Sequence, residues 1–185
     1  MIPTPLEAEQ LPGHPLLEQF AAEMVNQPTP PGVRYWLLHD RYRRPERQAE
    51  ALARGTSNAA YGQSPHSRWS GSGAETPWAG AAIDIYPILD VSIEYNGQTI
   101  EAGSVSPLQV HYQPIADLAA VYGLENLGTK YGWDWAHSQL TDWRDYPVLP
   151  DPDARRLPSS TQAGPSLLAV GATVGALAYL ARGLF

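Results

Sequence analysis

The chain contains no cysteine, so it can form no disulfide bond, and any metal ion must be bound by histidine, aspartate or glutamate. It has no long basic run and a formal net charge of −7, which argues against nucleic acid as a partner because phosphate binding needs clustered lysine and arginine. Residues 1–20 contain acids and prolines in place of a basic, apolar leader. We therefore expect no N-terminal signal peptide.

The length and the hydrophobic content of the chain are sufficient for one domain and a tail. Hydrophobic residues make up 43% of the 185 residues, which is enough for a substantial core. The aromatic residues are mostly of the kind with a polar group, with 6 Trp and 10 Tyr against 2 Phe. Such residues line binding clefts or lie in a core with the polar group satisfied. The core interpretation is favoured.

Helix and strand patterns are mixed without a strand–helix–strand rhythm, which predicts an α+β fold with a small antiparallel sheet flanked by helices. Residues 33–39 and 81–89 have strand character, and residues 91–100 alternate around Asn96-Gly97, a strong hairpin signal. Helices are expected at 15–25, 45–55 and 114–124. The long loop between residues 56 and 80 is of the kind that is usually functional or mobile.

The composition divides the chain into four parts. We expect a proline-punctuated N-terminal segment at 1–32, a catalytic domain at 33–145, a proline-rich tether at 146–164 and a hydrophobic helix at 165–185 that lies outside the core. Residues 165–181 carry no charge and contain Gly171 and Gly175 in a GxxxG pattern, which permits close packing of membrane helices. Anchoring to a membrane or to a particle is favoured over docking on the chain's own domain.

One aspartate stands where a charge is unfavourable. Asp84 lies within the apolar run from Ala81 to Ile85, and a buried carboxylate needs a partner. Together with His66 and His137 it could form a set of two histidines and one carboxylate that leaves one position of a zinc ion open, as in catalytic zinc sites. A histidine near aromatic residues is more often structural, so the composition alone leaves both interpretations open.

Three motifs resemble those of one enzyme family. Ser64-Pro65-His66 and, further on, Gly80-Ala81-Ala82-Ile83-Asp84 are similar to the two halves of S-x-H-x-x-G-x-A-x-D in zinc peptidases of the D-alanyl-D-alanine carboxypeptidase and L-alanyl-D-glutamate endolysin family. The segment Tyr42–Gln48 resembles the family's Y-R-S-x-x-R-Q. Residues 132–137, with an acid three positions before a histidine, resemble its closing motif. All three occur in the family's order between residues 33 and 143.

The resemblance implies a role for each matching residue. His66, Asp84 and His137 would bind Zn²⁺, Asp134 would act as general base, and Arg43 would hold a substrate carboxylate or the developing oxyanion. The substrate would be the stem peptide of bacterial peptidoglycan. The enzyme would be carried in a phage virion or fixed to the bacterial membrane or cell envelope through residues 165–185. Supporting positions around the ligands or in the substrate cleft would be Ser64, Tyr42 and Trp133.

The chain departs from the family in the segment Ser67–Ala79, which is inserted between the first histidine and the aspartate. We expect its Trp69 and Trp78 at the rim of the site, either as a lid that grips substrate or as a loop packed against a neighbouring chain. Glu75 in the same segment is an alternative carboxylate, although a solvated position is favoured for it. Of the other histidines, His39 is the one closest to the motifs; all are interpreted as structural or surface residues.

Two further functions compete with a peptidoglycan peptidase. The chain could be a non-catalytic structural or binding protein that retains the peptidase fold, although every ligand position and the base position are filled. It could also be a zinc peptidase that acts on another peptide.

Overall fold

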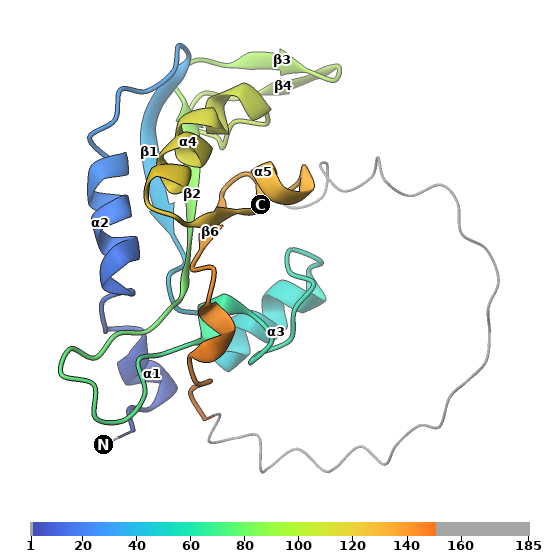
Figure 1. Ribbon diagram of the computed structural model, residues 1–185. Helices are drawn as coiled ribbons and strands as arrows, with labels where there is room; N and C mark the ends of the chain where they lie inside the picture. Colours follow the sequence, from blue (N-terminus) through green and yellow to red (C-terminus); the bar gives the residue numbers. More distant parts are fainter. Residues whose placement is uncertain (1, 151–185) are drawn as a thin grey trace.

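A computed structural model describes residues 2–150 of the chain. Its centre is a four-stranded antiparallel sheet with strand order β1-β2-β6-β5 (Figure 1). The strands are β1 (Val33–His39), β2 (Ala82–Leu89), β5 (Glu125–Asn126) and β6 (His137–Gln139). The predicted α+β fold with a small antiparallel sheet is thereby confirmed.

The predicted hairpin is also present, as a separate two-stranded sheet of β3 (Ile93–Tyr95) and β4 (Gln98–Ile100). Asn96 and Gly97 at its turn have φ values of 51° and 76°. Left-handed conformations at both central residues define the turn that matches the twist of the flanking strands, and asparagine and glycine adopt them readily.

The helices begin where the sequence offers proline or a capping side chain. Proline stands in the first turn of α2 (Pro15–Met24) and α3 (Pro45–Ala53), where the missing N–H is not needed. The remaining α-helices are α1 (Pro5–Ala8), α4 (Gln113–Val121) and α5 (Leu127–Tyr131), and the 3₁₀ turns are η1 (Pro65–Ser67), η2 (Gln109–Tyr112) and η3 (Trp143–Asp145).

The main hydrophobic core lies between the sheet and the helices α2 and α4. Leu17 and Phe20 of α2 and Ile115 of α4 are fully buried against Ile83 and Ile85 of β2. In Figure 1, α2 lies on one side of β1 and β2, and α3 lies on the other. Helix α2, within the N-terminal segment expected at 1–32, therefore supplies much of the core of the domain that follows it.

A second, smaller cluster extends the domain at its C-terminal side. It consists of Ala8, Tyr42, Trp69, Ala79 and Leu149, with Leu149 fully buried. Backbone hydrogen bonds join the same regions, since Trp69 N–H donates to the carbonyl of Pro147 over 3.2 Å. The first residues of the expected tether, 146–150, thus pack against the domain through Leu149.

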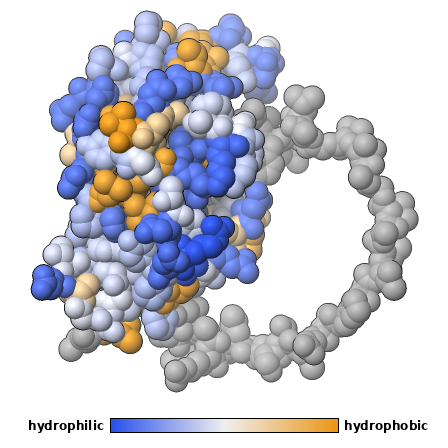
Figure 2. Space-filling view, in the orientation of Figure 1, coloured by the Kyte–Doolittle hydropathy of each residue, from blue (hydrophilic) through white to orange (hydrophobic). Residues whose placement is uncertain are grey.

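The predicted hydrophobic helix at 165–185 lies outside the described residues, as does the rest of the expected tether. Among residues 2–150, no helix is both long and apolar enough to cross a membrane. On the face shown in Figure 2, hydrophobic residues form small patches separated by hydrophilic ones.

Candidate metal centre

The centre forms on the middle of β2, where the strand changes character from one residue to the next. Side chains alternate between the two faces of a strand. Ile83 and Ile85 enter the hydrophobic core, so Asp84 between them points to the opposite face. The register places Asp84 beside His39 of β1 and His137 of β6. This pairing explains how residues distant in the sequence reach one point.

His66, Asp84 and His137 converge at that point. The distances are 2.9 Å from His137 Nδ1 to Asp84 Oδ1, 3.5 Å from His66 Nε2 to the same oxygen, and 3.3 Å between the two ring nitrogens. Ligands 2.0–2.2 Å from a tetrahedral zinc ion are separated by about 3.3–3.6 Å. All three residues are buried. Two of the three separations lie in this range, and the third, from His137 to Asp84, is shorter at 2.9 Å. The chemistry of the three ligands suits a zinc ion, which the side chains could hold after a small widening.

Backbone contacts fix the orientation of His66. Its Nδ1 lies 2.9 Å from the carbonyl oxygen of Arg41, and a carbonyl only accepts, so Nδ1 carries the hydrogen and Nε2 presents a lone pair. Ser64 caps the η1 turn by accepting from the N–H of His66 over 3.3 Å. The expected supporting role of Ser64 is thus that of a residue that shapes the turn.

The carbonyl group of Arg41 also leaves room only for glycine at position 80 of the motif. The φ of Gly80 is +93°, and a Cβ at this position would lie 2.3 Å from the Arg41 oxygen. Any larger residue would displace the carbonyl that orients His66. The glycine and the histidine of the motif are therefore parts of one packing arrangement.

The electrostatics of the centre favour a positive charge between the ligands. Burial alone would raise the pKa of Asp84, but His66 and His137 hold it well below its ordinary value. Burial opposes protonation of His137, yet its hydrogen bond to Asp84 and the charge of that residue raise its pKa above the ordinary value. A proton or a metal cation would satisfy the same three atoms.

Arg43 contacts the carboxylate of Asp84 at Oδ2, whereas the two histidines contact Oδ1. Its Nη2 donates to Asp84 Oδ2 over 3.4 Å and to Asp40 Oδ2 over 2.9 Å. Its Nη1 donates to Gln48 Oε1 over 3.2 Å, and Gln48 is fully buried on α3. The guanidinium thus orients Asp84, whereas the sequence suggested that it holds substrate.

Asp134 lies beside the centre in a strained backbone conformation. Its φ is 54°, an uncommon value that aspartate tolerates better than most residues and that occurs at functional sites. The residue is exposed, but surrounding protein atoms desolvate its carboxyl group. This desolvation and the charge of Asp84 raise the pKa of Asp134, as suits a group that accepts and returns a proton.

Three of the expected cleft residues lie elsewhere. Tyr42 is buried in the small cluster and bonds through its hydroxyl to Tyr61 over 2.9 Å. Trp69 packs in the same cluster and Trp78 in the main core. The rim position expected for both tryptophans is therefore wrong, because the inserted segment buries its aromatic residues within its own chain.

Trp133, also expected in the cleft, lies at the surface. It is 51% exposed and stacks on Tyr131 with ring centroids 6.0 Å apart, directly before Asp134 in the sequence. Glu75 is exposed, as its solvated interpretation predicts. It is not one of the three residues that converge at the centre.

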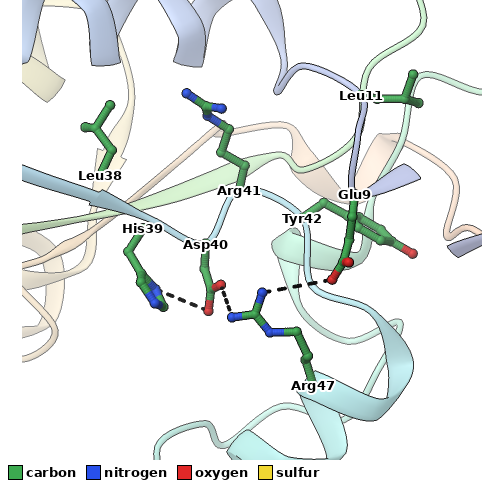
Figure 3. A pocket seen from close by; sticks show the side chains of 8 residues that line it. All are labelled: Glu9, Leu11, Leu38, His39, Asp40, Arg41, Tyr42 and Arg47. Carbon is green, nitrogen blue, oxygen red and sulfur yellow. Dashed lines mark hydrogen bonds and ion pairs between the residues drawn. The ribbon is translucent and has the colours of Figure 1, made fainter. Parts of the chain in front are cut away.

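The structure adds residues that the sequence did not single out. Asp40, next to His39, links Arg43 to Arg47, whose Nη2 lies 2.9 Å from Asp40 Oδ1. Its only signal in the sequence was its position before the Tyr42–Gln48 motif. Asp40, His39 and Arg47 line a pocket of about 320 Å³ together with Glu9. Figure 3 shows their side chains around it. Gln139 and Glu125, on the far side of His137, had no signal at all.

His39, Asp40 and Asp84 also lie close enough together to be considered as metal ligands. The guanidinium of Arg43 bonds to both carboxylates of that group. The positively charged guanidinium therefore already lies between these carboxylates. The set of His66, Asp84 and His137 is the better candidate for a metal site.

Comparisons of the chain with protein-family models, with curated proteins and with solved structures find no match. The functional assignment rests on the motifs and on the geometry of the centre.

Proposed function

We propose that the chain is a zinc-dependent peptidase that cleaves the peptide stems of bacterial peptidoglycan. The observation that carries the proposal is the convergence of three buried ligand atoms within 3.5 Å, next to an aspartate with a raised pKa. These residues occupy the positions at which the motifs resemble those of the zinc peptidase family. The proposal therefore assigns these residues to a catalytic centre and not to a purely structural one.

His66, Asp84 and His137 would hold the zinc ion, which supplies a Lewis acid for the scissile carbonyl and an activated water. Asp134 takes a proton from the attacking water and delivers it to the leaving amine, for which its raised pKa is favourable. Arg43 orients Asp84 through its bond to Oδ2. Exposed Trp133 offers a surface beside the base on which part of the substrate can pack.

Attachment to a phage particle or to the cell envelope is the second part of the proposal. It rests on the uncharged stretch at 165–181 and its GxxxG pattern. The peptidase activity does not depend on it, since the centre is formed entirely by residues 2–150.

The test combines metal analysis with digestion of purified peptidoglycan and mass analysis of the new ends. We expect one zinc ion per chain and newly formed amino and carboxyl termini in the stem peptide, all abolished by His66→Ala. Bound zinc without cleavage would favour the non-catalytic binding protein. Cleavage of other peptides but not of peptidoglycan would assign a different substrate.

A further inference from the structure

The side chain of Gln139 contacts the one ligand whose protonation the backbone does not fix. His137 Nε2 lies 3.0 Å from Gln139 Oε1, while its Nδ1 faces Asp84 Oδ1 at 2.9 Å. Both neighbours can accept a hydrogen bond. The neutral imidazole carries only one hydrogen, so two tautomers compete.

Asp84 by itself favours the tautomer that cannot bind metal. A carboxylate only accepts, so it attracts the hydrogen to Nδ1, the nitrogen that faces His66 and would be the ligand atom. If the amide of Gln139 were free to rotate, its NH₂ group could donate to Nε2 and support this unfavourable tautomer.

Glu125 prevents that rotation. Gln139 Nε2 donates to Glu125 Oε1 over 2.8 Å, and the other carboxylate oxygen of Glu125 is paired with Lys130. Because an ionised carboxylate cannot donate, the amide nitrogen must face Glu125 and the amide oxygen must face His137. Gln139 is only 6% exposed, so water competes little for these groups.

We infer that, when a zinc ion replaces the hydrogen on Nδ1 of His137, the chain of contacts from Lys130 through Glu125 to Gln139 holds the imidazole hydrogen on Nε2 and so stabilises the metal-binding tautomer. Gln139 and Glu125 are thus positioning residues of the proposed zinc site, and the inference deepens the function proposed above. Partners that orient a histidine ligand typically change metal affinity by about 10–100-fold.

The matched variants are Gln139→Leu and Ser138→Ala. Leucine is of similar size and has no acceptor. Ser138 is a fully buried neighbour on the same strand that accepts from Asn126 Nδ2 over 3.2 Å and does not touch the imidazole of His137. The double variant Glu125→Gln with Gln139→Glu reverses the donor and the acceptor but again presents an oxygen to His137.

The first measurement is the state of the His137 Nε2–H group in the zinc-loaded chain, from long-range ¹H–¹⁵N NMR spectra of the imidazole. We expect a hydrogen-bonded Nε2–H group that exchanges slowly with solvent in the wild type and in Ser138→Ala, and one that exchanges faster in Gln139→Leu. The second is the affinity for Zn²⁺ alone, by competition with a chelator. We expect a loss of about 10–100-fold in Gln139→Leu and recovery to within a few-fold in the double variant.

A wild-type Nε2–H group without a hydrogen bond would overturn the inference, as would a Gln139→Leu variant with an unchanged Nε2–H group and unchanged zinc affinity. Equal losses of zinc affinity in Gln139→Leu and Ser138→Ala would also overturn it, since they would indicate a general loss of packing. The expected differences in zinc affinity without any cleavage of peptidoglycan would support the inference and overturn the proposed function.

Discussion

The two faces of β2 have different roles, although adjacent residues of the strand form them. On one face, Ile83 and Ile85 are packed among side chains of α2 and α4, where any apolar group of suitable shape can contribute. On the other face, Asp84 contacts two histidines and one arginine, each at a defined atom. The apolar face therefore determines how stable the domain is. The polar face determines what it can bind, and its geometry depends on hydrogen-bond partners from four separate segments.

Removal of one ligand is the strongest test of whether the two faces of β2 have separate roles. His66→Ala should abolish zinc binding and peptidase activity, because two remaining ligands cannot complete the site. The far-ultraviolet circular dichroism should stay that of a folded chain. Zinc content by mass spectrometry checks the prediction, with Glu75→Ala as a control at an exposed acid. A variant that still binds one zinc ion would show that the ligand set is wrong.

The opposite experiment perturbs the apolar face. Ile83→Ala should lower the free energy of unfolding by about 2–5 kcal/mol, through lost burial and a residual cavity. Zinc stoichiometry at a temperature where the variant is folded should not change. Denaturant unfolding together with zinc titration measures both. If zinc binding were lost in the folded variant, the two faces would not be independent.

The role of Asp134 can be separated from metal binding. Asp134→Ala should keep zinc and lower kcat by about 10²-fold, as expected when a general base is removed. This corresponds to about 2.7 kcal/mol in the activation barrier. Steady-state kinetics with zinc content measured on the same samples test this, and Asp90→Ala serves as the control for the loss of an exposed acid. Near-normal turnover in Asp134→Ala would refute the assigned role.

Gly80→Ala tests the backbone support of His66. The new Cβ would collide with the Arg41 carbonyl, and we expect zinc affinity to fall by about 10-fold or more, in the lower range for partners that orient ligands. Gly103→Ala, also at a positive φ but with no heavy atom within 4 Å of its added Cβ, is the matched control for strain alone. Equal zinc affinity in the two variants would contradict the proposed support.

The smallest expected effect concerns the end of the chain. Deletion of residues 160–185 should leave a soluble, zinc-binding and active protein and remove its attachment. Deletion from residue 146 should in contrast destabilise the domain, because Leu149 is buried in the small cluster. Thermal unfolding of both truncated chains decides this. A shorter chain of unchanged stability would show that residues 146–150 are dispensable.

Local patterns in the sequence were sufficient for most of the elements. The strand-favouring residues of β1 and β2, the alternation around the Asn96-Gly97 turn and the prolines at the starts of α2 and α3 act over a few residues. They can therefore be read directly from the sequence. The boundaries at 32 and 146 could not be predicted in the same way. They depend on which apolar residues find partners far away, such as Leu17 and Leu149.

The same division applies to the centre. The sequence by itself determined the ligand types, because the absence of cysteine and the costly position of Asp84 left histidine and carboxylate as partners of a cation. It could not decide the placement of Trp69 and Trp78, the turn of Arg43 toward Asp84 and Asp40, or the contact of Gln139 with His137. Those contacts follow from the strand register and from side-chain packing. Only the tertiary structure decides which donor faces which acceptor, because a hydrogen bond depends on distances of a few tenths of an ångström between residues far apart in the chain.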